Sequence, residues 1–412
     1  MDALFVYGDR VAQDREGCFY IGTAFSQEIF DRYLEYFDHL ILVMRKSPVD
    51  PSDTGALRRM NRITSERIRV IYLPDTVGSV RQFLDPRIRR EIRTVLERQI
   101  TPDRAVILRL HSSYCYIAAR ICVKRGIPYL AEAVGCPWDS LTHHSLKGKV
   151  LAPSAAAQMR YCMRHAAYAI YVTKKFLQSR YPTNGVSAAV SDVELLPAEE
   201  TTLARRLDKI RELKAGQDRR LRIGTSGTVQ VAYKGQRFVF GALADLKKRG
   251  ICRYEYHLAG GGDDTELRNL AEKLEIEDLV VFEGSLPHDR IYGWLDDLDL
   301  YIQPSEVEGL SRALIEAMSR ALPVFASDAG GNRELVSDPS CIHKIGAVQE
   351  IVKELETLTP ERMSDMAKQN FEIAKGYQKE LLCKERGAIL ARFAEASAKR
   401  TDSSRVYIHN ET

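Results

Sequence analysis

The sequence predicts an α/β protein with two consecutive blocks of parallel β-sheet. Short apolar runs of strand length alternate with amphipathic helical segments along both halves of the chain, a pattern typical of parallel sheets. A charged, helix-prone stretch at residues 198–221 lies between the halves. The chain has 412 residues, of which 45% are hydrophobic and 28% charged, enough for two ordinary globular cores.

In the first block, six apolar runs are expected to form strands. Two intervening segments, 25–37 and 88–100, carry apolar residues at the spacing of one helical face. The expected strands are 3–7, 40–45, 69–73, 105–110, 128–131 and 169–172.

The second block repeats the alternation after the charged stretch. A long charged helical stretch, roughly 360–398, follows the last strand, and the final residues are expected to fray. The expected strands are 221–224, 254–259, 279–282, 300–302 and 323–326.

The cysteine spacing and the lengths of the apolar runs argue against a disulfide-linked, zinc-binding, membrane-spanning or secreted protein. The eight cysteines include no CxxC pair, so we expect reduced, buried thiols rather than disulfides or a zinc site, with Cys115 and Cys122 in a helical core face. No apolar run approaches the roughly 20 residues that cross a bilayer, and the N-terminus lacks a signal-peptide pattern. We therefore expect a cytoplasmic protein.

Positive charge gathers in one segment. Residues 140–191 contain no Asp or Glu but seven Lys or Arg, so this segment alone exceeds the formal net charge of +4. Such a surface suits an anionic membrane or a phosphate-bearing acceptor; a solvated surface without a partner is the alternative. No nucleic acid is expected, because no aromatic platform or known binding motif accompanies the basic residues.

The most informative segment spans residues 299–336, which reads as strand, loop, helix and strand. Glu308 precedes the helix and Glu316 lies about two turns into it. The unpaired amides of Gly309, Leu310 and Ser311 at the helix start would hold an anion. Ionised carboxylates only accept hydrogen bonds, so one can take sugar hydroxyls and the other the two hydroxyls of a ribose.

Three further segments of the second block follow expected strands. Residues 224–228 form a glycine- and hydroxyl-rich loop, and Lys234 after it can place a point charge on a phosphate, although an idle loop lysine is the alternative. The glycines at 260–262 fit a tight strand-to-helix turn better than a dinucleotide fingerprint. Residues 281–287, which include Leu286, offer backbone groups to a nucleobase edge. Together these segments would surround a nucleoside diphosphate at the carboxyl ends of a parallel sheet.

These residues resemble the donor-binding half of the family-4 retaining glycosyltransferases, most strongly over about 221–340. The specific part is the pair Glu308-x7-Glu316, supported by Lys234 followed by glycine. The resemblance implies the GT-B fold, in which two Rossmann-like domains face a cleft and a C-terminal helix returns toward the N-terminal domain. We therefore expect domains at 1–197 and 198–375, the returning helix at 376–400 and a frayed tail at 401–412.

The resemblance also implies roles for individual side chains. Glu308 would meet the transferred sugar, Glu316 the ribose and Lys234 the diphosphate. The family commonly has Arg after the first glycine of the loop, and that position is matched here to Thr225. Phosphate binding is therefore expected to fall more heavily on the loop residues Ser226, Gly227 and Thr228.

The first block matches the family less closely. Gly22 lies in a loop that would reach the donor phosphates. His111 follows an expected strand where the family often has a histidine at the cleft; a hydrogen-bonded structural histidine is the alternative. Glu132, Trp138 and Asp139 are expected to shape the acceptor side, in a segment similar to enzymes of extracellular polysaccharide assembly.

No metal site is expected. Asp297 and Asp299 form the DxD pair that holds a metal in other glycosyltransferases, but Asp299 directly precedes a buried strand, and the pair more readily caps the start of that strand. No cofactor is expected beyond the nucleotide-sugar substrate.

The sequence thus predicts a metal-independent, retaining glycosyltransferase. It would move a sugar from a UDP- or GDP-type donor to a hydroxyl of a saccharide or lipid-linked acceptor in polysaccharide biosynthesis. The alternatives are a nucleotide-sugar epimerase or phosphorylase on the same fold, or a non-catalytic partner subunit. A peripheral position at the inner face of the plasma membrane, through residues 140–191, is a further expectation.

Overall fold

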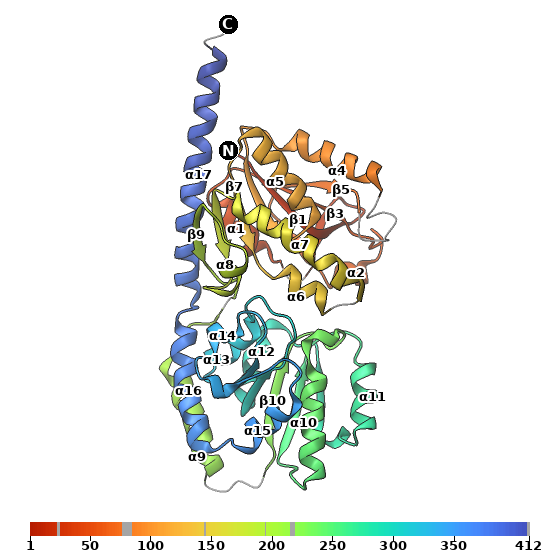
Figure 1. Cartoon of the computed structure of the whole chain (residues 1–412), viewed down its shortest axis with the longest axis vertical. Helices are drawn as coiled ribbons and strands as arrows, with labels where there is room; N and C mark the ends of the chain where they lie inside the picture. The colour runs from red at the N-terminus through yellow and green to blue at the C-terminus, as the bar shows by residue number, and fades with distance from the viewer. Residues whose placement is uncertain (23–24, 76–84, 144–145, 194, 215–218, 410–412) are drawn as a thin grey trace.

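The computed structural model contains two β-sheets, one in each half of the chain, stacked along the long axis of the molecule (Figure 1). It describes residues 1–22, 25–75, 85–143, 146–193, 195–214 and 219–409, with only the backbone at 214, 288 and 401–409. Both sheets are covered by helices on their two faces, as the strand-helix alternation predicts.

Among the described residues, the N-terminal sheet has nine strands, with a parallel core in the order β5-β3-β1-β6-β7-β8-β9. All six expected strands are present. The short strands β2 and β4 add an antiparallel edge at the end of β1, and β9 extends the other side. The strands are β1 (Ala3–Gln13), β2 (Phe19–Ile21), β3 (Leu40–Lys46), β4 (Asn61–Ile63), β5 (Ile68–Leu73), β6 (Ala105–Leu110), β7 (Tyr129–Ala133), β8 (Tyr168–Tyr171) and β9 (Val186–Ala189).

The N-terminal helices form two layers. α5 and α7 pack on one face of the sheet, and α1 on the other. Ser112 begins α5 by accepting a hydrogen bond from the amide of Cys115 (3.2 Å). Burial raises the pKa of Cys115 and of Cys122 to about 12, so the expected core positions of both thiols are confirmed. The helices are α1 (Gln27–Leu34), α2 (Thr54–Leu57), α4 (Pro86–Gln99), α5 (Ser113–Arg125), α6 (Pro137–Thr142), α7 (Leu146–Arg164) and α8 (Phe176–Arg180).

The C-terminal sheet is parallel, in the order β12-β11-β10-β13-β14-β15. The strand order switches at β10, with β11 and β12 added on one side of it and β13 to β15 on the other. Parallel sheets bind ligands at the carboxyl ends of the strands that flank such a switch point. The strands are β10 (Leu221–Ser226), β11 (Tyr254–Ala259), β12 (Val280–Gly284), β13 (Leu300–Gln303), β14 (Val324–Ser327) and β15 (Ile342–His343).

Helices again cover both faces of this sheet. α10 and α15 pack together, and α13 packs against α16, which in turn contacts α9. The helices are α9 (Glu200–Lys214), α10 (Gln236–Lys248), α11 (Thr265–Lys273), α12 (His288–Asp297), α13 (Arg312–Ser319), α14 (Asn332–Leu335), α15 (Val348–Glu356) and α16 (Pro360–Lys375).

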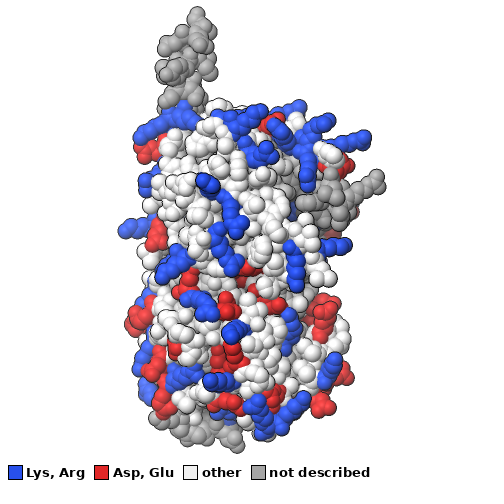
Figure 2. Space-filling view, in the orientation of Figure 1, with Lys and Arg blue, Asp and Glu red and all other residues white. Residues whose placement is uncertain are grey.

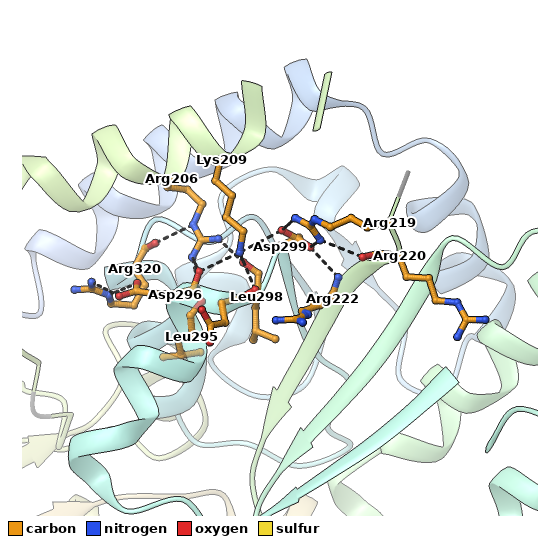
Figure 3. Close-up of polar contacts among 11 residues, drawn as sticks. Arg206, Lys209, Arg219, Arg220, Arg222, Leu295, Asp296, Leu298, Asp299 and Arg320 are labelled. Atoms are coloured by element: carbon orange, nitrogen blue, oxygen red, sulfur yellow. Dashed lines mark hydrogen bonds and ion pairs between the residues drawn. The ribbon is translucent and has the colours of Figure 1, made fainter. Parts of the chain in front are cut away.

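The connecting helix α9 is fixed to the second domain by two cations, the buried Arg206 and the half-buried Lys209 (Figure 3). The guanidinium of Arg206 donates to the carbonyls of Leu298 and Leu295, at the end of α12 and the turn that follows it. Burial lowers the pKa of Arg206 to about 10. Lys209 donates to the carbonyl of Asp297 (2.7 Å). Both cations therefore satisfy carbonyls that the helix end leaves open.

Asp299 belongs to the same cluster (Figure 3). Arg219 binds both of its carboxylate oxygens (2.6 and 2.8 Å), and the amide of Arg222 donates to it (2.8 Å). Burial alone would raise the pKa of Asp299, but the bonds from Arg219 and the nearby Lys209 hold it below the usual range. These contacts agree with the interpretation of Asp299 as a cap at the start of β13.

The last helix, α17 (Lys379–His409), runs back along the N-terminal domain (Figure 1). It is separated from α16 by residues 376–378. Phe393 of α17 packs against Phe37 and Tyr168 of the N-terminal domain, with ring centroids 6.2 and 5.4 Å apart. The helix continues to His409, beyond the expected start of a frayed tail at 401, while 410–412 lie outside the described residues. Within the described part of the chain, no helix combines the length and apolarity needed to cross a bilayer.

Candidate active site

A cavity of about 340 Å³ lies between the two domains. His111 and residues 134–136 line it from the N-terminal domain, and Lys234, Glu308 and Gly309 from the C-terminal domain. The C-terminal residues follow the carboxyl ends of β10 and β13, on either side of the switch point. The structure therefore brings together His111, Lys234 and Glu308, the three side chains that we predicted to be catalytic from the sequence.

Lys234 and Glu308 form an ion pair in this cavity. The ammonium Nζ lies 2.9 Å from Oε1 of Glu308. Gly235 permits the turn, because its φ is +75° and an added Cβ would lie 2.0 Å from the carbonyl oxygen of Pro304. Gln303 also donates to Glu308 (3.2 Å), so the carboxylate has two donors.

A hydrogen-bonded chain connects the last residue of β10 to Glu308. The amide of Ser226 donates to the Tyr301 hydroxyl (3.1 Å), and that hydroxyl donates to Oε1 of Gln303 (3.0 Å). Burial raises the pKa of Tyr301, so the phenol stays protonated. Tyr301 and Gln303 were not predicted; a polar glutamine at the end of an apolar strand was the available signal.

Thr225, the residue matched to the usual arginine position, does not lie in the loop as expected. β10 continues through Ser226, and the Thr225 hydroxyl is buried, donating to the carbonyl of Ile302 (2.6 Å) and accepting from Tyr256 (2.7 Å). The first glycine outside the strand is Gly227, with φ +152°. The loop position after this glycine is therefore Thr228, which is only partly buried.

The glycine turn at 260–262 packs against this loop. A Cβ on Gly260 would lie 1.8 Å from the carbonyl oxygen of Gly227, and the Thr228 hydroxyl donates to the carbonyl of Gly261 (2.9 Å). The turn therefore brings two backbones close together, in agreement with the tight-turn interpretation.

Glu316 lies on α13, whose first turn is capped by Ser311 through a bond from the Leu314 amide (3.3 Å). Burial raises the pKa of Glu316 to about 7, partly opposed by Arg312. Its carboxylate has no hydrogen-bond partner among the described residues. The group is therefore available to accept bonds from a ligand, at a cost to the free protein.

His111 lines the cavity and is exposed to it. The protein packed around the imidazole nevertheless limits its hydration, and this desolvation lowers the pKa of the imidazole to about 4. The imidazole is therefore neutral near pH 7. No polar partner holds the ring within the described part of the chain, so the structure does not support the alternative of a hydrogen-bonded structural histidine.

Glu132 is not an acceptor-side residue. Its side chain is 1% exposed and does not line the cavity; it accepts from Arg109 (2.9 Å) and from the hydroxyl of Tyr33 (2.8 Å). Arg109 and Arg386 of α17 also bind Asp192 (2.6 and 2.7 Å). This buried network instead joins α17 to the N-terminal sheet.

The other predicted residues that do not line the cavity are Glu316, Leu310, Ser311, Ser226, Gly227, Thr228, Trp138, Asp139, Gly22 and Leu286. Trp138 is exposed on α6, and Asp139 pairs with Arg180 (2.7 Å). Gly22 follows β2, and the next two residues, 23–24, lie outside the described part of the chain. Leu286 lies in the loop after β12. Their proposed roles stay predictions.

The domains also touch directly beside the cavity. A Cβ on Gly309 would lie 2.5 Å from the carbonyl oxygen of Val134, so the helix start abuts the N-terminal backbone. The Glu334 carboxylate accepts bonds from three successive amides, those of Lys174 (2.6 Å), Lys175 (3.0 Å) and Phe176 (2.5 Å). These contacts set the spacing of the two walls of the cleft.

A second cavity, of about 590 Å³, adjoins the first within the N-terminal domain. Both are lined by Tyr7, Leu110 and His111. α7 supplies much of the remaining wall, including Leu151 and Met159. No local sequence pattern indicates this cavity, because its walls come from strands and helices far apart in the chain.

Comparisons with known proteins agree with this arrangement. The family described as "Glycosyl transferases group 1" matches residues 210–372. Protein CapJ of Staphylococcus aureus is 30% identical over 341 residues, covering 82% of this chain and 81% of that protein. The amylovoran biosynthesis glycosyltransferase AmsK of Erwinia amylovora is 34% identical over 110 residues, 25% of this chain and 27% of that protein. Among solved structures, Anabaena HepE in complex with UDP aligns with 97% of this chain and 100% of that chain, at a TM-score of 0.60 and 16% identity.

Proposed function

Because this chain belongs to the group 1 glycosyl transferases and has the GT-B fold that its sequence predicted, we propose that it is a retaining, metal-independent enzyme. It transfers a sugar from a UDP- or GDP-type donor to a hydroxyl of a saccharide or lipid-linked acceptor. The observation that carries this proposal is that Lys234, Glu308 and His111 line one cavity between the two domains.

The diphosphate of the donor binds between Lys234 and the first turn of α13. Lys234 is the only cation lining the interdomain cavity within the described residues, and the amide groups at Gly309 to Ser311 add the positive end of a helix. Negative charge develops on the diphosphate as the glycosidic bond breaks, so fixed donors at that point lower the barrier. This charge compensation by the protein supports the proposal that no metal is needed.

The two glutamates have separate tasks. Glu316 accepts bonds from the ribose hydroxyls, and the lack of a hydrogen-bond partner for its carboxylate among the described residues supports this role. Glu308 accepts hydrogen bonds from the hydroxyls of the transferred sugar after the diphosphate has replaced it as the ion-pair partner of Lys234. The hydrogen bond from Gln303 keeps the Glu308 carboxylate in place during this exchange.

Transfer proceeds with retention because the incoming hydroxyl and the departing phosphate lie on the same face of the sugar. The bond from the anomeric carbon to the phosphate oxygen breaks as the bond to the acceptor oxygen forms, and the phosphate takes the acceptor proton. His111 is neutral, so it orients a sugar hydroxyl as a donor or acceptor rather than supplying a positive charge.

The acceptor enters from the second cavity, which meets the donor cavity at His111. We assign the enzyme to polysaccharide biosynthesis because of its similarity to AmsK, named as an amylovoran biosynthesis glycosyltransferase. A cytoplasmic protein, with peripheral contact to an anionic membrane through residues 140–191, remains the proposed setting.

A thermal-shift screen with UDP, GDP and their sugar conjugates tests the proposal, since a ligand bound only by the native state raises the unfolding midpoint. We expect one nucleotide series to raise it and Glu316→Ala to abolish the rise. Incubation with a labelled donor then separates a glycoside from an epimer or a phosphorolysis product. Absence of any shift with all nucleotides would refute the proposal and favour a non-catalytic partner.

A further inference from the structure

Helix α7 presents an apolar face to solvent. Leu146 and Val150, one turn apart, are both 79% exposed, and the adjacent Leu151 is 44% exposed. The opposite face, with Ala152, Ala156, Met159 and Met163, is buried in the domain. The first two turns of the helix therefore carry apolar side chains on the exposed side as well, whereas a helix that only covers a sheet exposes polar residues there.

Basic residues flank this exposed apolar face. At 3.6 residues per turn, the order around the first turns of the helix is Lys149, Leu146, Val150, Lys147 and Leu151. All five are exposed. Apolar residues interleaved with lysines, without an acid nearby in sequence, are typical of helices that lie in the interface of a membrane.

The charge pattern continues along the helix and beyond it. The same face carries Arg160 and Arg164 further along, both exposed, and residues 140–191 contain no carboxylate side chain. Figure 2 shows that the N-terminal domain, at the top, displays mainly Lys and Arg among uncharged side chains, whereas both signs are mixed over the C-terminal domain. The surface around α7 is thus complementary to negative charge.

We propose that the exposed face of α7, centred on Leu146, Val150, Lys147 and Lys149, docks on the surface of an anionic lipid bilayer. The apolar side chains enter the boundary between head groups and acyl chains, and the lysines contact lipid phosphates. This inference rests on the proposed function, because it places the acceptor of that reaction on a lipid.

The position of this surface agrees with that use. Leu151 lies at its edge and also lines the cavity that reaches His111. A protein seated on α7 would hold this cavity beside the membrane, so an acceptor sugar anchored in the bilayer could reach the reacting centre without leaving the lipid.

A second copy of the chain fits this surface less well. Stable protein–protein interfaces use about 20–30 residues on each side, whereas the apolar patch consists of three large side chains. Two such patches would also bring Lys147 and Lys149 of both copies together, and like charges would repel.

Co-sedimentation with vesicles tests the proposal. We expect the protein to bind phosphatidylglycerol-containing vesicles at low salt and not pure phosphatidylcholine vesicles. Lys147→Gln with Lys149→Gln should weaken binding roughly 25-fold, about fivefold for each lysine near the surface. Leu146→Gln with Val150→Gln should weaken it by at least about tenfold, through loss of apolar burial.

Matched controls lie on the other domain. Lys248→Gln on α10 and Ile345→Gln change an exposed lysine and an exposed apolar residue far from α7 in the chain and should leave vesicle binding unchanged. Equal binding by the α7 variants and the wild type would overturn the proposal. So would sedimentation of a dimer that Leu146→Gln with Val150→Gln dissociates, since a second copy would then be the occupant.

The same variants separate this inference from the proposed function. Each should keep the nucleotide-induced rise in unfolding midpoint, because α7 lines no part of the donor cavity. Loss of vesicle binding with the nucleotide response intact supports the docking surface. A wild type that binds vesicles but no nucleotide would refute the donor site and leave the surface standing, and the reverse result would refute the surface alone.

Discussion

The substitution Glu316→Gln is expected to stabilise the free protein and to weaken its binding of nucleotide. Glutamine keeps the shape of the side chain but cannot ionise. In the free protein, burial raises the pKa of Glu316 to about 7 and the charge of Arg312 offsets this only in part. No side chain or amide within the described residues donates a hydrogen bond to the carboxylate. The carboxylate is thus a ligand-binding group that the fold itself disfavours.

The sign and size of the stability effect follow from this pKa. The folded protein binds the Glu316 proton more tightly than the unfolded chain, whose value is near 4.5. Stability is therefore lost as pH rises from about 4.5 to about 7, and the loss is complete above 7. At about 1.4 kcal/mol per pH unit the full cost is at most roughly 3 kcal/mol. Glu316→Gln should recover most of it at pH 8 and only about 1 kcal/mol at pH 5.

The effect on binding has the opposite sign. A carboxylate accepting two ribose hydroxyls contributes about 1.5–3 kcal/mol per bond, and an amide oxygen accepts more weakly. We expect at least a tenfold weaker affinity for UDP or GDP in Glu316→Gln, measured by calorimetry at pH 8. In the wild type, affinity should rise with pH through about 7, because the nucleotide selects the ionised carboxylate.

Unfolding midpoints at pH 5 and pH 8 provide the stability measurement. Glu272→Gln, which neutralises an exposed carboxylate on α11, is the matched control and should change neither stability nor binding. A stability gain that is the same at both pH values would refute the assigned burial of Glu316. Unchanged nucleotide affinity would refute its contact with the ribose.

Three further predictions concern the cleft and the domain interface. Lys234→Ala should lower kcat about 10²–10³-fold in a donor-turnover assay by removing charge stabilisation of the leaving diphosphate, whereas Lys248→Ala on the surface should not. Gly309→Ala should lower kcat while nucleotide affinity, measured by calorimetry, changes little, because its Cβ would lie 2.5 Å from a carbonyl oxygen of the other domain; equal losses in both would contradict this. Arg386→Met should lower the free energy of unfolding by about 3–5 kcal/mol in urea titrations, since it leaves Asp192 in a buried network short of one cation; a loss below about 1 kcal/mol would argue against that network.

Sequence patterns predicted those parts of the site whose residues directly follow a recognisable strand. Glu308 and Lys234 each follow a strand that apolar runs mark clearly, and parallel strands bring their carboxyl ends to one edge of a sheet. The pairing of these two side chains at 2.9 Å could not be predicted. It depends on β10 and β13 being neighbours, and strand order is set by packing across the whole domain.

The end of β10 shows why one boundary was misjudged. Gly224, Thr225 and Ser226 have the composition of a loop, yet they pair with β11 and continue the strand. Tertiary pairing outweighs their weak preference for strands. The Thr225 hydroxyl is satisfied by Ile302 and Tyr256, two residues far along the chain, so no local pattern could show that it faces the core.

Glu132 was misassigned for a related reason. An isolated acid after an apolar run looks like an exposed residue at a strand end, and that is how the sequence placed it. Its partners Tyr33, Arg109 and Arg386 come from α1, β6 and α17. Such a network is visible only once the C-terminal helix has returned to the first domain.

The ion pair between Lys234 and Glu308 links the binding of the donor diphosphate to the availability of the Glu308 carboxylate for the sugar. In the free protein each charge neutralises the other, so neither is left alone in a partly dry cavity. A diphosphate carries more negative charge than one carboxylate and has the amides of α13 as additional donors, so it displaces Glu308 from Lys234. The freed carboxylate, still held by Gln303, then becomes the acceptor that the sugar hydroxyls need. Under the proposed function, the nucleotide therefore prepares the group that recognises the sugar, and a nucleotide lacking the second phosphate should leave the pair closed.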